Sequence, residues 1–123
     1  MAPDILIVDD SAAIRKILQR VLRQAEIAIG NILEAAEGLE ALETLKQHKI
    51  DLVLSDINMP KMDGLQLLSA IKASPVWRHL PVVMITTEGG EAKVAEAVKL
   101  GAIGYVRKPF TADQIKEKLL GIL

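Results

Sequence analysis

Short, continuous apolar runs alternate with amphipathic segments along most of this 123-residue chain. The clearest runs are Ile5–Val8, Leu52–Leu54 and Val82–Ile85, and weaker ones span Asn31–Ala35 and Ile103–Val106. Continuous runs, in contrast to alternating ones, are typical of strands that are covered on both faces. The pattern therefore predicts five strands, with the two weaker ones nearer the sheet edges.

Between these runs, apolar residues recur at helical spacing and predict five amphipathic helices. In chain order, the apolar positions are Ile14, Ile17, Leu18, Val21 and Leu22; Leu39, Leu42 and Leu45; Leu65, Leu68 and Ile71; Val94, Ala97 and Val98; and Ile115, Leu119 and Leu120. Gly101 is placed to end the fourth helix, and Thr111 with Gln114 forms a capping-box pattern at the start of the fifth. Strands that alternate with helices predict an α/β domain with a parallel sheet, right-handed crossovers and helices on both faces.

Composition excludes several kinds of protein. The absence of cysteine rules out disulfides and thiolate metal sites, and the net charge of −1 offers no basic face for nucleic acid. No apolar run is long enough to span a membrane, and the N-terminus lacks the basic region of a signal peptide. We therefore expect one cytoplasmic domain over residues 1–123 that binds neither nucleic acid nor membrane.

Polar residues stand where four of the predicted strands end. Asp9 and Asp10 follow the first strand, Asp56 ends the third, Thr86 ends the fourth, and Lys108 follows the fifth. Ligands of an open parallel sheet bind beyond the carboxyl ends of its strands. We therefore expect three carboxylates, a hydroxyl and a cationic side chain to converge on one rim.

Three carboxylates in one place repel one another, so at least one would have a raised pKa unless they are neutralised. A hard divalent cation with oxygen ligands removes this repulsion, and Mg²⁺ suits the set best because it needs few protein carboxylates. A carboxylate beside Mg²⁺, a hydroxyl and a lysine resembles the apparatus of phosphoryl transfer. In such a site an aspartate can act as the nucleophile.

Each of these residues also has an ordinary structural explanation. The acidic pair or Ser11 could cap the first helix, Asp56 could begin a turn, Thr86 could be a plain strand residue, and Lys108 could be a solvated lysine. Their coincidence at strand ends on one rim favours a functional site, because a random arrangement would scatter them over both rims.

Four motifs in order resemble the response-regulator receiver domain of two-component signalling, in its single-domain, CheY-like form. They read "ILIVDDS", "LVLSDINMPKMDG", "PVVMITTE" and "GYVRKPF", and the resemblance covers essentially the whole chain. It implies a flavodoxin-like, doubly wound α/β fold with a five-stranded parallel sheet in the order 2-1-3-4-5.

The resemblance also implies roles for the rim residues. Asp56 matches the phosphorylated aspartate, and Asp9 and Asp10 match the acidic pair that holds Mg²⁺ with it. Asn58 matches the position whose backbone carbonyl completes the metal shell. Thr86 matches the hydroxyl that turns toward the phosphoryl group, and Tyr105 matches the aromatic switch residue. Lys108 matches the lysine that pairs with the phosphoryl group, and in this family its bond to the next residue, Pro109, is typically cis.

In function, the resemblance implies a phosphoacceptor signalling domain and no enzyme beyond its own Mg²⁺-dependent phosphorylation and dephosphorylation. A histidine kinase would supply the phosphoryl group. A motor switch protein, a phosphotransferase or an effector would then bind the face formed by the fourth helix, fifth strand and fifth helix, with the protein acting as a monomer. The two positions that tune phosphate loss in this family hold Asn58 and Glu88, which favours rapid self-dephosphorylation. Thr87 is bulkier than the residue often found there, and Gly89–Gly90 predicts a mobile loop.

Two other hypotheses compete with this one. An aspartate-dependent phosphohydrolase commonly carries a second aspartate two residues after its nucleophile, but Asn58 occupies that position. A constitutive interaction domain could keep the fold without switching, but the complete set of rim residues argues against a decayed site. Turnover of a phosphomonoester would support the enzyme, and failure to bind Mg²⁺ would support the inert domain.

Overall fold

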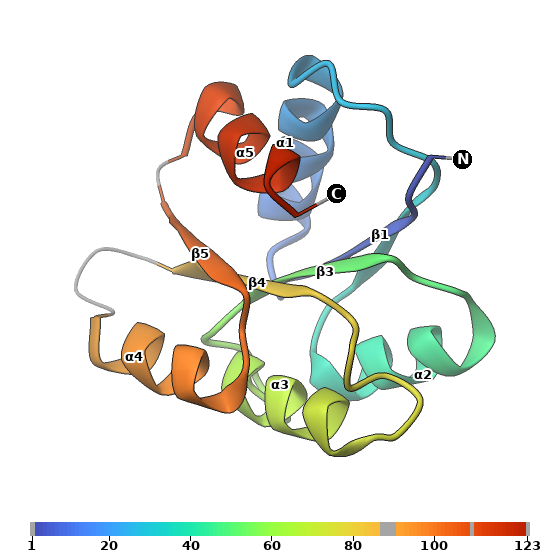
Figure 1. The fold of residues 1–123 in the computed structure, drawn as a ribbon, viewed down its shortest axis with the longest axis vertical. Helices are drawn as coiled ribbons and strands as arrows, with labels where there is room; N and C mark the ends of the chain where they lie inside the picture. The colour runs from blue at the N-terminus through green and yellow to red at the C-terminus, as the bar shows by residue number, and fades with distance from the viewer. Residues whose placement is uncertain (1, 87–90, 109, 123) are drawn as a thin grey trace.

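The computed structural model describes residues 2–86, 91–108 and 110–122, and it confirms the predicted alternation of strands and helices (Figure 1). The elements are β1 (Ile5–Val8), α1 (Ala12–Gln24), β2 (Ile32–Ala35), α2 (Gly38–Gln47), β3 (Leu52–Asp56), α3 (Gly64–Ala73), β4 (Val82–Thr86), α4 (Glu91–Leu100), β5 (Gly104–Arg107) and α5 (Ala112–Leu120). All strand pairs are parallel, and the sheet order is β2-β1-β3-β4-β5, as expected.

Helices cover both faces of the sheet. Figure 1 shows α1 and α5 on one side and α2, α3 and α4 on the other, which matches two separate clusters of buried side chains. Leu18, Leu22, Ile115 and Leu119 pack against one face of the sheet. The other cluster contains Leu45, Leu67, Leu68, Ile71 and Ala97. Covering both faces explains why the central strands read as continuous apolar runs.

Burial distinguishes the central strands from the edge strands. Every residue of β1, β3 and β4 is buried, whereas β2 and β5 at the edges are partly exposed. In β3 and β4, burial extends beyond the apolar residues to the polar residues Asp56 and Thr86 at the strand ends. Both strands therefore carry a polar side chain to the carboxyl edge of the sheet.

The helix ends follow the predicted signals. Gly101 has a φ of +110°, which favours glycine, and Ala102 N–H donates to Ala97 O at 3.0 Å as α4 ends. At the start of α5, Gln114 N–H donates to Thr111 Oγ1 at 3.2 Å and Gln114 Oε1 accepts from Thr111 N–H at 2.9 Å. This is the predicted capping box.

The apolar stripes of the helices are narrower than their spacing suggests. Ile17, Leu39, Val98 and Leu120 lie in these stripes but are exposed, because they stand at the margins of the faces that meet the sheet. Among the helices of the described residues, none is long and apolar enough to cross a membrane.

Candidate functional site

The carboxyl ends of β1, β3, β4 and β5 meet at one edge of the sheet, toward the left of Figure 1. Asp9 and Asp10 directly follow β1, Asp56 ends β3, and each offers a carboxylate oxygen within 4.8 Å of the others. Asp9 and Asp56 are buried, whereas Asp10 is exposed. The structure thus brings together the three carboxylates that the sequence placed on one rim.

Lys108 supplies a positive charge to this acidic cluster. Its Nζ lies 3.1 Å from Asp9 Oδ2 and 3.7 Å from Asp56 Oδ1, and its side chain is largely buried. Lys108 is held in place by its backbone N–H, which donates to Thr86 O at 2.6 Å. One ammonium group facing three carboxylates leaves the cluster with excess negative charge, and hard oxygen donors suit a divalent cation such as Mg²⁺.

The electrostatics of Asp56 follow from this arrangement. Burial raises the pKa of the Asp56 carboxyl, and the nearby Asp9 and Asp10 raise it further. Lys108 and the hydrogen bond from Ile57 N–H, at 2.8 Å, lower the pKa but do not cancel these effects. An ionised Asp56 in the metal-free protein is therefore a source of instability.

Replacing Asp56 with asparagine should raise the stability of the metal-free protein at neutral pH, by roughly 1 kcal/mol. Because the pKa of Asp56 is raised in the folded state, the native protein keeps this carboxyl protonated at a pH at which the unfolded chain has already lost the proton. Ionising Asp56 therefore lowers the stability of the native protein. The advantage of Asp56→Asn should therefore shrink as the pH falls through the folded-state pKa. Urea unfolding in EDTA across the acidic range measures this difference.

Glu96→Gln is the matched control for that experiment, because it neutralises an exposed carboxylate on α4 outside the acidic cluster. It should leave the stability nearly unchanged at every pH. A destabilising Asp56→Asn at neutral pH would contradict the account of the charge balance.

The start of α1 shows which residue caps the helix and which belongs to the acidic cluster. Ser11 is the N-cap of α1, with its Oγ accepting from Ile14 N–H at 3.3 Å, whereas Asp9 Oδ1 accepts from Ser11 N–H at 2.9 Å. Arg15 Nη1 donates to Asp9 O at 2.6 Å and Arg15 Nε pairs with Glu34 at 2.9 Å. Arg15 thereby fixes the backbone of Asp9, a role that its place on the polar helix face did not indicate.

The chain after Asp56 turns back tightly before α3. Gly64 N–H donates to Ile57 O at 2.7 Å, and Asp63 caps α3 in a capping box with Gln66. A Cβ on Gly64 would lie 2.2 Å from Asp56 O. Asp56 and Gly64, the first and last residues of "DINMPKMDG", therefore lie in close backbone contact.

Asn58, in this turn, is exposed, and its Oδ1 accepts a hydrogen bond from Lys93 Nζ of α4 at 2.8 Å. The sequence did not assign Lys93 to the site. This contact links the turn after β3 to α4. It places a third cationic side chain, after Lys108 and Arg15, near the acidic edge.

Thr86 and Tyr105 come from adjacent strands. Met84 pairs with Tyr105 and Thr86 pairs with Arg107 in the β4–β5 register, so alternation puts the Thr86 and Tyr105 side chains on the same face of the sheet. Thr86 is buried, whereas Tyr105 is half-buried against the core beside α4, with Lys118 Nζ 5.4 Å from its ring centroid. Thr87, Glu88, Gly89–Gly90 and Pro109 lie outside the described residues.

This fold and its acidic edge define a flavodoxin-like α/β domain whose chemistry is suited to phosphoryl transfer beside a divalent cation. The model of the response regulator receiver domain family matches residues 5–120. The chain therefore belongs to the response regulator receiver family.

Comparison with individual proteins and solved structures gives the same family. The chemotaxis protein CheY-3 of Vibrio cholerae is 46% identical over 115 residues, which cover 94% of this chain and 87% of that protein. The structure of the chemotaxis response regulator CheY4 of Vibrio cholerae has a TM-score of 0.88 at 32% identity and covers 100% of both chains. The Mn²⁺-bound form of the response regulator Rcp1 has a TM-score of 0.80 at 31% identity, covering 98% of this chain and 91% of that one.

Proposed function

We propose that Asp56 is the phosphoacceptor of this two-component response regulator and that a histidine kinase is its phosphodonor. The observation that carries the proposal is the placement of Asp56, at the end of a buried strand, with two other carboxylates and Lys108 around it. An Asp56 oxygen would attack the phosphorus and form an O–P bond. The donor's bond to phosphorus would break, and the leaving group would take the bonding electrons.

Asp9, Asp10 and Asp56, with the backbone carbonyl of Asn58, would hold Mg²⁺. When bound, the cation neutralises charge on the carboxylates and on the phosphoryl oxygens. The crowding of three carboxylates with one lysine supports this assignment, as does the Mn²⁺-bound relative. The same site would catalyse loss of the phosphoryl group to water, and this self-dephosphorylation is the only turnover we propose.

Thr86 and Lys108 would bind the phosphoryl group, and Tyr105 would report the change to the surface. Support comes from the shared sheet face of Thr86 and Tyr105 and from the pairing of Lys108 with Asp56. An anion on Asp56 would attract the Thr86 hydroxyl and leave room for the Tyr105 ring to move inward. Such a switch needs a difference of only a few kcal/mol between the two states.

The output surface would be the face of α4, β5 and α5. Val98 and Ile103 are exposed on it, and Tyr105 lines a cavity of about 550 Å³ with Gln114 and Lys118. A downstream protein, such as a motor switch protein, a phosphotransferase or an effector, would bind there. The chemotaxis names of the relatives favour chemotaxis-like signalling, and we propose a cytoplasmic monomer.

Incubation with acetyl phosphate and Mg²⁺ should add one labile phosphoryl group to the protein, as measured by intact-mass spectrometry. Asp56→Asn should gain none, because it lacks the nucleophilic oxygen, and EDTA should prevent the gain in the wild type. Asp113→Asn, which changes a carboxylate in the first turn of α5, should label like the wild type.

Equal labelling of Asp56→Asn would overturn the assignment of the phosphoacceptor. No labelling with acetyl phosphate, phosphoramidate or a phosphorylated kinase would favour a domain that binds partners without phosphorylation. Turnover of an unrelated phosphomonoester would instead favour a phosphohydrolase.

A further inference from the structure

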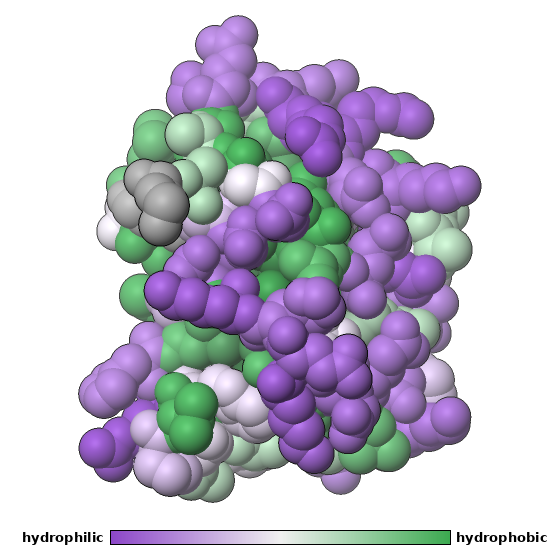
Figure 2. Space-filling view, turned by 90° about the vertical axis from the view of Figure 1, so that its right-hand side faces the viewer, coloured by the Kyte–Doolittle hydropathy of each residue, from purple (hydrophilic) through white to green (hydrophobic). Residues whose placement is uncertain are grey.

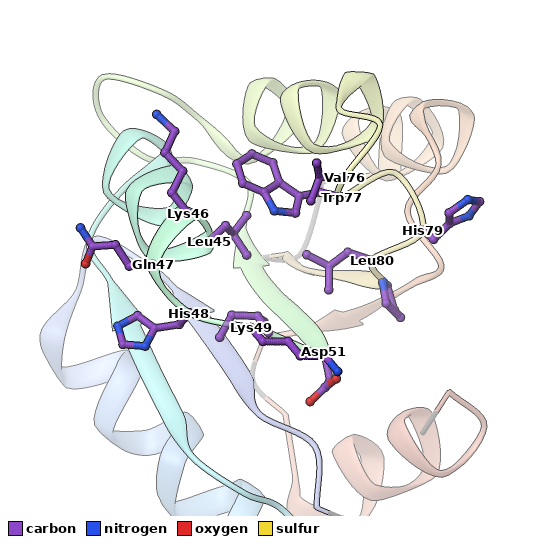
Figure 3. Close-up of a pocket in the computed structure, with 12 residues that line it drawn as sticks. Leu45, Lys46, Gln47, His48, Lys49, Asp51, Val76, Trp77, His79 and Leu80 are labelled. Atoms are coloured by element: carbon purple, nitrogen blue, oxygen red, sulfur yellow. The ribbon is translucent and has the colours of Figure 1, made fainter.

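A second cavity, of about 550 Å³, opens at the amino ends of β3 and β4, on the edge opposite the acidic cluster (Figure 3). It lies between the last residues of α2 and the turn that joins α3 to β4, within the described residues. Its volume is in the range of ordinary binding pockets. The lining residues used below are Leu45, Lys46, His48, Lys49, Asp51, Val76, Trp77, His79 and Leu80, and we call it the Trp77 cavity.

The wall that carries Trp77 is fixed by hydrogen bonds. Lys72 Nζ donates to Arg78 O at 3.1 Å and to Leu80 O at 2.9 Å, while Ser74 Oγ accepts from Trp77 N–H at 3.3 Å. Burial lowers the pKa of the Lys72 ammonium, in keeping with its use as an internal clamp. A wall held in this way needs little ordering when something binds, which favours affinity.

The chemistry of the cavity is apolar inside and cationic at its margin. Figure 3 shows Trp77, Leu45 and Leu80 gathered around the space, with the two histidines at its outer margins. Lys49 makes no ion pair within the described part of the chain, and Lys46 has only an exposed pair with Glu43 at 3.3 Å, a type that contributes little.

The single carboxylate of the cavity lining is already engaged, because Asp51 Oδ2 accepts from Asp4 N–H at 2.8 Å. Figure 3 also shows this carboxylate turned away from the Trp77 ring. Lys46 and Lys49 therefore face a single carboxylate in the lining, and this excess of positive charge favours an anionic occupant.

We propose that the Trp77 cavity binds an acidic segment of a partner protein, which inserts an apolar side chain beside Trp77 and faces Lys46 and Lys49 with carboxylates. A chain segment suits this site better than a small molecule, because the cavity is open and one of its apolar lining residues is itself largely exposed. Val76 at its edge is 80% exposed. Figure 2, which views this side of the molecule, shows apolar patches between hydrophilic side chains.

The position of the cavity makes this docking independent of phosphorylation. Asp51 directly precedes β3 and Asp56 ends it, so the two residues lie about 17 Å apart at the rise of an extended strand. The cavity lining and the acidic cluster share no residue, so phosphorylation at the cluster would not touch the docked segment. The segment would thus tether a partner in both signalling states, a role distinct from the output face.

The probe is a synthetic peptide with a central Leu-Phe pair flanked on each side by two glutamates, and it is titrated into the 123-residue chain in EDTA. Trp77, the sole tryptophan, gives a fluorescence signal, and amide chemical shifts map the site. We expect saturable binding with a dissociation constant of about 1 mM or tighter, and shifts confined to residues 45–51 and 74–81. Lys49→Glu should weaken binding roughly tenfold, because it removes an attraction and adds a repulsion.

Lys99→Glu is the matched control, since it makes the same charge change on α4 away from the cavity, and it should bind like the wild type. Beryllofluoride with Mg²⁺ should not change the affinity. Equal binding of a peptide with glutamine in place of glutamate would overturn the electrostatic recognition. Phenylacetate binding without the peptide, or concentration-dependent self-association through the same residues, would replace the proposed occupant. Because the titration needs no phosphorylation, its failure leaves the phosphoacceptor proposal intact.

Discussion

Gly64→Ala should lower the free energy of unfolding by roughly 3 kcal/mol or more, although it adds only one methyl group. The added Cβ would lie 2.2 Å from Asp56 O and 2.8 Å from Ile57 Cα. These are backbone atoms held by the Gly64 N–H···Ile57 O hydrogen bond, so they cannot swing aside as a side chain can. Urea unfolding followed by far-UV circular dichroism measures the loss.

Gly104→Ala is the control, because its Cβ would meet only Lys118 Cδ at 3.9 Å, an ordinary contact. Its stability should change by less than about 0.5 kcal/mol. If both alanine variants lost the same stability, the close approach at Gly64 would not be the cause. In the Gly64 variant, we also expect slower phosphorylation of the folded fraction, since the turn that follows Asp56 must shift.

Lys108→Met should destabilise the metal-free protein by roughly 3 kcal/mol and at the same time strengthen Mg²⁺ binding. Without the ammonium, the buried Asp9 and Asp56 carboxylates lose their shared counterion. The same ammonium opposes a second cation at these oxygens, so its removal leaves a more attractive site. Urea unfolding with and without Mg²⁺ should show that the metal restores most of the lost stability.

Lys16→Met removes one positive charge from an exposed position of α1 and is the matched control. It should change neither stability nor metal affinity by a measurable amount. A Lys108→Met protein with the same deficit in EDTA and in Mg²⁺ would show that the lysine acts through packing and does not balance the carboxylates.

The sequence predicted the meeting of Asp9, Asp56, Thr86 and Lys108 because a parallel sheet brings the carboxyl ends of its strands to one edge. That inference needs only the order of strands and helices, which hydrophobic patterning records well. The end of α4 at Gly101 and the start of α5 at Thr111 could also be predicted, since each depends on only a few neighbouring residues.

Contacts between distant side chains could not be predicted in this way. Arg15 reads as one more polar residue of a helix, and Lys93 as a surface lysine, until the paths of their helices place them beside Asp9 and Asn58. Capping was ambiguous for a related reason. Both Ser11 and the acidic pair can cap a helix, and the geometry of one turn decides that the serine does.

Asp9 and Lys108, which pair at 3.1 Å, are 99 positions apart in the chain. During synthesis on the ribosome, the acidic residues and Asp56 emerge long before their counterion. A nascent chain therefore carries these carboxylates without their counterion until β5 has been made and docked beside β4. Chains that end before β5 would lack Lys108 and could not complete the acidic site.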